Sequence, residues 1–175
     1  QGSSYSVDFS APNHGQAILN NNDSISYIPE ADFYGTDAFT YTVSIGYKSA
    51  SANVNITVNP INDIPIINNL AASISVNEDQ TAVITVSASD VDDDTLTYSL
   101  TGTDSSFLSI SSSGVIVFNS APDYETKSSY LVTINVGDGT DTVSQALTII
   151  IINVSDVAPV FTSEATWSAA ENQTA

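Results

Sequence analysis

The chain has 175 residues, of which 20 are acidic and only two, Lys48 and Lys127, are basic, so its formal net charge is -18. A charge of this sign and size repels nucleic acids and anionic membrane surfaces, which excludes polyanion-binding functions. However, 42% of the residues are hydrophobic and only 13% are charged, so the chain is not an acidic disordered tail and can bury one or two cores.

The amino-acid composition also limits how a small domain of this chain can be cross-linked. The sequence has no cysteine, which excludes disulfide bonds and thiolate metal sites. Bound cations are the expected substitute, because the many acidic residues can supply oxygen ligands. No run of about eighteen apolar residues is present, so we expect no membrane insertion.

The sequence of residues 1–64 predicts strands, but it does not predict a complete domain. Pro29-Glu30-Ala31-Asp32-Phe33 leads into a stretch in which aromatic and β-branched residues alternate with polar ones, which is typical of a strand. This part ends at the boundary phrase Asn62-Asp63-Ile64-Pro65. Its front is shorter than that of the following part by about thirty residues, enough for two strands. We therefore expect residues 1–64 to form an incomplete first module.

Residues 65–158 predict a complete module. The candidate strands, separated by turn residues, are Ser73 to Asn77, Ala82 to Ala88, Thr95 to Thr101, Phe107 to Ile110, Val115 to Phe118, Ser129 to Val136 and Thr142 to Val154. Seven short strands predict an all-β, Ig-like sandwich with Greek-key connections. From Tyr130 to Val136 every second residue is apolar or aromatic, which is the period of a sheet packed on one side.

The last candidate strand contains the run Ile149-Ile150-Ile151-Ile152. This run is apolar on both faces, and an open edge of that kind is an aggregation hazard. We therefore expect it to be paired with or covered by another element.

The boundary phrase occurs twice, because Ser155-Asp156-Val157-Ala158-Pro159 follows the second module as Asn62-Asp63-Ile64-Pro65 follows the first. Each copy is preceded by an acidic phrase, and the one in the second module is Pro122-Asp123-Tyr124-Glu125. Such self-similarity predicts an array of like modules in tandem.

The end of the chain repeats the start of the second module. Ser168-Ala169-Ala170-Glu171-Asn172 resembles Ser75-Val76-Asn77-Glu78-Asp79. We therefore expect residues 159–175 to supply the opening strand of a third module.

These motifs resemble those of the cadherin family, especially the cadherin-like repeats of large bacterial surface adhesins. In chain order they are the opening glutamate motif Val76-Asn77-Glu78-Asp79, the acid-x-acid motif Asp90-Val91-Asp92, the central acidic pair Asp123-Tyr124-Glu125, the late aspartate motif Gly137-Asp138-Gly139 and the linker from Asn153 to Pro159. The linker departs from the family pattern, because Asn153 and Ser155 stand where the family has Asp and Asn.

Residues 12–65 are more similar to a related bacterial repeat. The matching phrases are His14-Gly15, Tyr27-Ile28-Pro29 and the stretch from Asp32 to Tyr41, in which acids and aromatic residues alternate around a glycine. This resemblance also implies a β-sandwich module.

The cadherin resemblance implies that Ca²⁺ binds at the seams between modules, through ligands that neighbouring modules share. Ca²⁺ takes six to eight oxygen ligands and tolerates loose geometry, which carboxylates from several strand ends can satisfy. Carried onto this sequence, the first seam would use Asp32, Asn62, Asp63, Asp90, Asp92 and Asp138. The second seam would use Glu78, Asp123, Glu125, Asn153 and Asp156. The first seam is expected to hold the more complete set of ligands.

Other acids are expected to be ordinary solvated loop residues, and these are Asp8, Asp23, Asp104 and Asp141. The stretch from Asp90 to Asp94 begins like an EF-hand loop, but Thr95 and Thr101 occupy the places of its glycine and its bidentate glutamate. An EF-hand is therefore excluded.

The sequence favours no enzymatic activity. The only histidine, His14, lies in a turn phrase with Pro12, Asn13 and Gly15. Glu30 and Asp32 are too close in sequence, before a strand of a repeat, to favour a glycosidase carboxylate pair. A carbohydrate platform of Trp167 with Tyr124 or Tyr5 stays an alternative to packing in cores or seams.

We therefore expect a structural and adhesive segment of an extracellular cell-surface protein, with Ca²⁺ as the element that stiffens its seams. The expected partners are neighbouring modules of the same chain, further copies through homotypic or strand-exchanged association, and a cell-surface protein or polysaccharide. The alternative is an accessory carbohydrate-binding or protein-binding module of a secreted multidomain enzyme.

Overall fold

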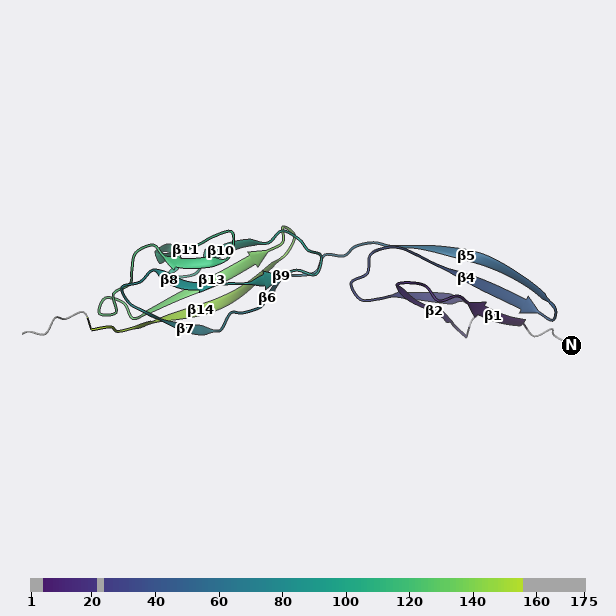
Figure 1. The fold of residues 1–175 in the computed structure, drawn as a ribbon, viewed down its shortest axis with the longest axis horizontal. Helices are drawn as coiled ribbons and strands as arrows, with labels where there is room; N and C mark the ends of the chain where they lie inside the picture. Colours follow the sequence, from purple (N-terminus) through teal and green to yellow (C-terminus); the bar gives the residue numbers. More distant parts are fainter. Residues whose placement is uncertain (1–4, 22–23, 156–175) are drawn as a thin grey trace, which may run out of the picture. The chain divides into compact units, whose positions relative to one another are not determined.

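The structure is a computed structural model that describes residues 5–21 and 24–155, and it is all-β (Figure 1). These ranges contain fourteen strands and one short 3-10 turn, η1 (Ser105–Phe107). The described residues include no helix long and apolar enough to cross a membrane. The predicted all-β class is confirmed, whereas Asp156 and the strand expected to open a third module lie outside the described residues.

The chain divides into two compact units. One contains residues 1–69, 86–99 and 135–144, and the other contains residues 70–85, 100–134 and 145–175. Turns far along the sequence join the first unit, because they hydrogen-bond to Asn62 and Asp63. The module boundaries drawn after residues 64 and 158 stay predictions.

Residues 5–58 form two small antiparallel sheets. Their strands are β1 (Tyr5–Phe9), β2 (Gly15–Leu19), β3 (Ile25–Pro29), β4 (Gly35–Ile45) and β5 (Lys48–Val58). One sheet has the order β1-β4-β5, and β2 pairs with β3 in the other. On β4, Phe39 is buried and meets Phe9 of β1 edge to face, with 6.3 Å between the ring centroids.

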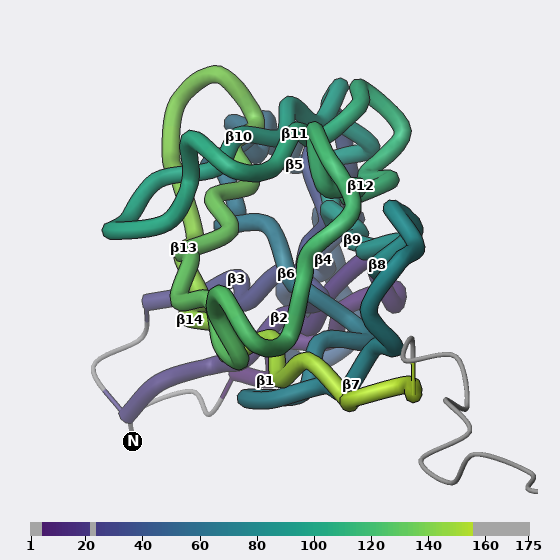
Figure 2. The backbone as a smooth tube through the Cα atoms, turned by 90° about the vertical axis from the view of Figure 1, so that its left-hand side faces the viewer, coloured from purple at the N-terminus to yellow at the C-terminus, as the bar shows by residue number. Residues whose placement is uncertain are grey.

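Residues 66–152 form a larger set of strands. They are β6 (Ile66–Ile67), β7 (Ser73–Asn77), β8 (Ala82–Thr85), β9 (Ala88–Ser89), β10 (Thr97–Thr101), β11 (Leu108–Ile110), β12 (Val115–Phe118), β13 (Ser129–Gly137) and β14 (Thr142–Ile152). One sheet has the order β10-β13-β14-β7, another has the order β11-β12-β8, and β6 pairs with β9. Figure 2 shows β13 and β14 on one side and β12 and β8 on the other, the arrangement of the predicted β-sandwich.

One candidate strand, Ala82 to Ala88, is interrupted in the structure. β8 pairs with β12, whereas β9 pairs with β6. Val86 lies between β8 and β9, and its side chain is fully buried. The backbone therefore changes its pairing partner between β8 and β9, from β12 to β6, while the side chain of Val86 stays buried in the core.

The core of the sandwich follows the alternation seen in the sequence. On β13, Val132, Ile134 and Val136 are completely buried, and Tyr130 is buried against Phe118 with 4.9 Å between the ring centroids. Each fully buried aliphatic side chain of this size contributes about 1.5 to 3 kcal/mol by leaving water. The predicted inward face of this strand is confirmed.

The isoleucine run of β14 is covered as expected. Ile149 and Ile151 point into the core and are at most 1% exposed. β7 pairs in parallel along the edge of β14, from Thr148 opposite Ser73 to Ile152 opposite Asn77. The apolar run is thus both buried on one face and hydrogen-bonded along its edge.

In the first part of the chain, the carboxylate of Asp37 connects three segments. It accepts hydrogen bonds from the backbone N–H groups of Asn13 (3.0 Å) and His14 (2.9 Å) and from the Tyr27 hydroxyl (2.8 Å). A Cβ on Gly15 would lie 2.6 Å from Ile28 O and 2.6 Å from the Tyr27 hydroxyl. The phrases His14-Gly15 and Tyr27-Ile28-Pro29 therefore have a structural reason, which is the close approach of β2 to β3 around this carboxylate.

Replacing Gly15 by alanine should destabilise the β2–β3 hairpin. The new methyl group would collide with a backbone oxygen, which cannot move without shifting the strand, and such overpacking costs about 1 to 3 kcal/mol. Hydrogen exchange of amides 15–29 should accelerate in the Gly15→Ala variant. The exposed neighbour offers a control, because Gln16→Ala should leave exchange unchanged, and equal exchange in both variants would contradict this explanation.

The Asp37 carboxylate should make the first part of the chain sensitive to acid. Burial alone raises its pKa, but the hydrogen bonds from His14, Asn13 and Tyr27 outweigh burial and lower the pKa to about 2. Because an unfolded Asp has a pKa near 3.9, the stabilisation is present above about pH 4 and is lost as the pH falls towards 2.

Thermal unfolding recorded between about pH 2 and pH 5 checks this expectation. The Asp37→Asn variant should show a smaller loss of stability across this window than the parent chain. Asp8→Asn, a change at an exposed residue of β1, is the control and should keep the parental slope. A parental slope in Asp37→Asn as well would show that this carboxylate does not cause the acid sensitivity.

Candidate metal centres

Two groups of acidic side chains converge in the structure. Glu78, Asp123 and Glu125 form the Glu78 cluster, and Asp90, Asp92 and Asp94 form the Asp90 cluster. Within each cluster, carboxylate oxygens of all three residues lie within 4.8 Å of one another. Unpaired like charges at this spacing repel strongly unless a cation lies between them.

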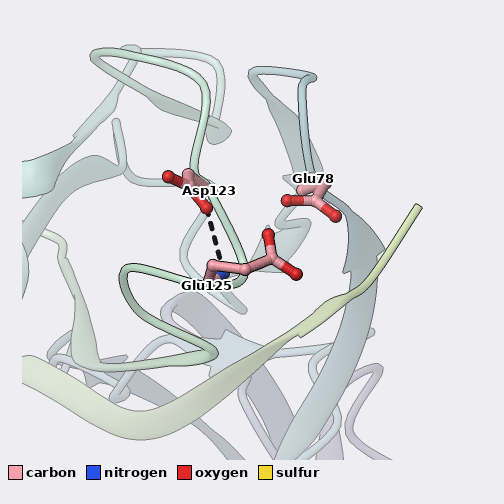
Figure 3. Close-up of side chains that lie close together, drawn as sticks. All are labelled: Glu78, Asp123 and Glu125. Carbon is pink, nitrogen blue, oxygen red and sulfur yellow. Dashed lines mark hydrogen bonds between the residues drawn. The ribbon is translucent and has the colours of Figure 1, made fainter. Parts of the chain in front are cut away.

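The Glu78 cluster is built from the end of β7 and the turn that precedes β13 (Figure 3). Glu78 is only 4% exposed, and its two carboxylate oxygens accept hydrogen bonds from the backbone N–H groups of Tyr124 (2.8 Å) and Val154 (2.7 Å). These bonds fix the carboxylate between two segments that are far apart in sequence. The position of Glu78 is therefore set by the fold rather than by solvent.

Asp123 is held in its ionised form by the turn that it opens. Its carboxylate accepts hydrogen bonds from Thr126 Oγ1 (2.8 Å) and from the N–H group of Glu125 (2.9 Å). The Thr126 hydroxyl is the main cause that holds the pKa of Asp123 below its usual range. Asn153 Nδ2 donates to Glu125 Oε1, which brings a fourth predicted ligand to the cluster.

The Asp90 cluster follows β9 and has a buried oxygen without a partner. Asp90 Oδ1 accepts a hydrogen bond from the N–H group of Asp92 (2.9 Å), whereas Asp90 Oδ2 is buried and has no hydrogen-bond partner among residues 5–21 and 24–155. A buried, unsatisfied carboxylate oxygen is rare in native structures because it loses its hydration without compensation. A cation bound at this oxygen would supply that compensation.

The first boundary phrase contacts this cluster directly. Asp63 donates its backbone N–H group to Asp92 Oδ2 (2.8 Å), and Asn62 donates its side-chain amide to Asp138 Oδ2 (3.0 Å). The Asn62 amide is the main cause that lowers the pKa of Asp138. Two residues of the phrase thus bring together acids from separate turns.

The carboxyl group of Asp63 lies in an acidic environment. Burial is the largest cause that raises its pKa, and the negative charges of Asp32, Asp92 and Asp90 raise it further. Asp32, Asp63 and Asp92 also line one hollow together with Tyr34 and Ile61. These acids therefore surround a common space, in which a cation would relieve their repulsion.

No basic side chain neutralises either cluster in the described part of the chain. Lys127 forms an ion pair with Asp104, at 2.5 Å, and among residues 5–21 and 24–155 no ion pair joins Lys48 to a cluster. Asp104 is only 6% exposed and also accepts the N–H group of Leu131 (2.8 Å). The expectation that Asp104 is a solvated loop residue is therefore wrong, because it is the buried partner of one of the two lysines.

The structure brings the predicted ligands together in two groups. Glu78, Asp123, Glu125 and Asn153 form one group, and Asp156 lies outside the described residues. The residues grouped around the Asp90 cluster are Asp32, Asn62, Asp63, Asp90, Asp92 and Asp138. Whether they bind a metal stays a prediction.

Sequence reasoning missed two acids in this region. Asp94 belongs to the Asp90 cluster, and Asp141 Oδ2 accepts the side-chain amide of Asn62 at 3.1 Å. The run of acids from Asp92 to Asp94 could have indicated that Asp94 belongs to this cluster. In the sequence, however, Asp94 was considered only as part of an EF-hand loop, and that loop was excluded. Nothing in the local sequence of Asp141 indicated a contact with Asn62.

The donor set defines the kind of ion that would fit. Both clusters offer carboxylate oxygens from turns and strand ends, and no sulfur or imidazole ligand is among them. Hard divalent cations prefer such ligands, and Ca²⁺ accepts their irregular geometry. The buried Asp90 Oδ2 and the buried Glu78 are consistent with that fit.

The β-sandwich with acids at its strand ends defines a repeat of the Ig-like class, and the comparisons with known proteins agree. The chain belongs to the bacterial Ig domain family, whose model matches residues 2–57 and 62–151. It is 34% identical over 167 residues to the protocadherin-like wing polarity protein stan of Drosophila melanogaster, across 86% of this chain and 5% of that protein.

A second relative is also a cadherin. The chain is 32% identical over 128 residues to the Fat-like cadherin-related tumor suppressor homolog of Drosophila melanogaster, across 67% of this chain. The chain spans only 5% and 3% of the lengths of these two relatives. The matches therefore concern a repeat, while the relatives are far longer proteins.

Solved structures show the same fold. A protocadherin gamma B7 cis-dimer of domains EC3-6 matches with a TM-score of 0.60 and 21% identity, across 94% of this chain and 45% of that one. Human protocadherin-24 domains EC1-2 match with a TM-score of 0.55 and 21% identity, across 85% of this chain and 82% of that one. The cadherin-like sandwich predicted from the sequence is confirmed as a fold.

Proposed function

We propose that this chain is a calcium-binding, cadherin-like repeat segment of an extracellular cell-surface protein, with a structural and adhesive rather than an enzymatic role. The observation that carries the proposal is the convergence of three carboxylates within 4.8 Å in each of two clusters, without an ion pair to a lysine in the described part of the chain. A bound divalent cation would turn this repulsion into attraction.

Each cluster has residues suited to hold Ca²⁺. Around the first boundary phrase, the ligands would be Asp32, Asn62, Asp63, Asp90, Asp92 and Asp138, with Asp94 added by the structure. Around the Glu78 cluster, they would be Glu78, Asp123, Glu125, Asn153 and Asp156. When bound, the ion supplies positive charge and oxygen coordination, while the hydrogen bonds to Glu78 and Asp92 orient the carboxylates.

The proposed role follows from where the acids lie in the sequence. We propose that residues 1–64 and 65–158 are successive modules, that residues 159–175 open a third, and that calcium stiffens the connection between them. The repeated motifs and the match to the bacterial Ig domain family support a place in a bacterial surface adhesin. The cadherins among the relatives support an adhesive array.

Small-angle scattering of the whole chain tests the stiffening directly. In about 10 mM CaCl₂, roughly ten times the weakest dissociation constant expected of an extracellular site, the chain should show a narrower distribution of interatomic distances than in chelator. Neutralising an acid of the first seam with Asp92→Asn should reduce this difference, whereas Asp8→Asn, at an exposed residue outside both clusters, should not. Identical scattering with and without calcium would overturn the proposed mechanical role.

A further inference from the structure

A hollow on the sandwich of residues 66–152 has the features of a small-ligand site. Its volume is about 360 Å³, and it is lined by η1, by the end of β12 with the loop that follows, and by β13. Ligand sites of proteins occupy roughly 300 to 1,000 Å³ and combine apolar walls with a few polar groups. All of its lining residues lie between positions 106 and 130, so described residues of one compact unit form it.

Aromatic rings form a wall of this hollow. Phe107 is 49% exposed, whereas Phe118 and Tyr130 are buried. The ring of Tyr130 meets those of Phe107 and Phe118 edge to face, with 5.5 and 4.9 Å between the centroids. These contacts hold the exposed ring of Phe107 in place. A fixed aromatic ring offers a flat apolar surface, against which a ring-shaped ligand can stack at a low cost in conformational entropy.

The hydroxyl group of Tyr130 has no hydrogen-bond partner in the described part of the chain. Tyr130 is only 7% exposed, and a tyrosine buried to this extent usually finds a partner for its hydroxyl group. This hydroxyl is not fully enclosed, because the one fully buried side-chain atom without a partner among residues 5–21 and 24–155 is Asp90 Oδ2. Since Tyr130 lines the hollow, a ligand there can supply the missing hydrogen bond.

The polar side chains around the hollow suit a ligand with several hydroxyl groups. Asn119 donates its amide to the carbonyl oxygen of Ser106 (3.0 Å), which fixes the side chain and leaves its own carbonyl oxygen as an acceptor. Asp123 Oδ2 accepts the Thr126 hydroxyl (2.8 Å), and a carboxylate oxygen can accept a second hydrogen bond. Asn119 and Asp123 therefore offer two oriented acceptors.

Charge narrows the class of ligand. The net charge of -18 repels anionic ligands, and Asp123 repels them locally. The ammonium group of Lys127 lies 5.3 Å from the ring centroid of Phe107 and 4.9 Å from that of Tyr130, so a cation already lies against these rings. We propose that this hollow binds a neutral hexose unit of a polysaccharide. The sugar ring stacks on Phe107, and its hydroxyl groups bond to Tyr130, Asn119 and Asp123.

The proposal gives the adhesive role of the proposed function a ligand of stated chemistry, but it does not rest on calcium. Asp123 also belongs to the Glu78 cluster, so sugar binding is tested in chelator. The calcium experiments contain no sugar. The two proposals can therefore fail separately.

The test follows the backbone amide resonances of the full chain in chelator while a neutral hexasaccharide of glucose, mannose or galactose is added. We expect at least one of the three to shift the amides of Phe107, Asn119 and Tyr130. The expected dissociation constant is on the order of 1 mM, as for one bound ring of about a dozen non-hydrogen atoms. A hexasaccharide of galacturonic acid, which is anionic, should cause no shift.

Two tyrosine variants form a matched pair for this test. Tyr130→Phe removes only the hydroxyl group and should weaken binding about twofold to tenfold. Tyr47→Phe makes the same change at a fully exposed tyrosine outside the hollow and should leave the dissociation constant unchanged. Phe107→Leu keeps an apolar side chain without the flat ring and should weaken binding at least about twofold.

Absence of shifts with all three neutral hexasaccharides at about 20 mM, well above the expected dissociation constant, would overturn the proposal. Shifts confined to amides away from the hollow would place the sugar on another surface and would overturn it as well. Parental affinity in both Tyr130→Phe and Phe107→Leu would have the same consequence.

Discussion

Replacing Asp104 by alanine is expected to lower the free energy of unfolding of the sandwich formed by residues 66–152 by about 3 kcal/mol. Removing one member of a buried ion pair costs about 3 to 5 kcal/mol, because the other charge loses its partner. We expect a cost at the lower end of this range, because the side chain of Lys127 is 37% exposed and can turn towards water. The variant also leaves the N–H group of Leu131 without its acceptor.

The surroundings of Lys127 explain why this pair matters. Its ammonium group lies 4.9 Å from the ring centroid of Tyr130 and 5.3 Å from that of Phe107, so it is held over aromatic faces as well as by Asp104. Lys127 is the main cause that holds the pKa of Asp104 below its usual range, followed by the Leu131 hydrogen bond.

Urea denaturation of Asp104→Ala, Lys127→Met and the double variant measures the coupling. The double variant should be less destabilised than the sum of the single variants by about 1 kcal/mol or more, because the two groups share one interaction. A loss below about 1 kcal/mol in Asp104→Ala would show that the carboxylate is dispensable and that packing alone fixes this turn.

Calcium is expected to stabilise the chain, and the Glu78→Gln variant should lose a large part of this stabilisation. At a concentration of about ten times the dissociation constant, each occupied site adds about 1.4 kcal/mol. Two occupied clusters would add about 3 kcal/mol, which corresponds to a rise in melting temperature of roughly 10 °C for domains of this size. Glu78→Gln removes one charged ligand. It should therefore abolish the part of the calcium-dependent stabilisation that the Glu78 cluster contributes.

Calorimetric melting in calcium and in chelator gives this difference for each variant. Because Glu78→Gln would also disturb the hydrogen bonds from Tyr124 and Val154, the calcium-dependent change in melting temperature is the readout, not the melting temperature itself. Asp8→Asn is the charge-neutralising control outside both clusters. A full calcium response in Glu78→Gln would remove the Glu78 cluster from the proposal.

Short-range patterns in the sequence predicted the fold well. The alternation from Tyr130 to Val136 placed β13 with the correct side facing the core, and the run from Ile149 to Ile152 indicated a strand that needed cover. Such patterns work because the period of a strand is set by its own backbone. The break between β8 and β9 was not visible, because it depends on which strand each half pairs with.

Contacts between distant segments could not be predicted from local sequence. Asp104 resembles any other turn acid until Lys127 is brought to it by the turn before β13. Asp37 stands in a repeat motif, but its role depends on Asn13, His14 and Tyr27 arriving from another hairpin. The predicted ligands came from family resemblance, and the structure adds Asp94 and Asp141 because folding brings their turns to the same place.

A calcium titration followed by the backbone amide resonances of the 18.3 kDa chain is the most direct test of calcium binding at the two clusters. The N–H groups of Tyr124 and Val154 bond to Glu78, and that of Asp63 bonds to Asp92, so these amides report on one cluster each. We predict that all three resonances shift and saturate with dissociation constants on the order of 0.1 to 1 mM. Unchanged resonances at these amides, in calcium well above that range, would contradict metal binding at both clusters.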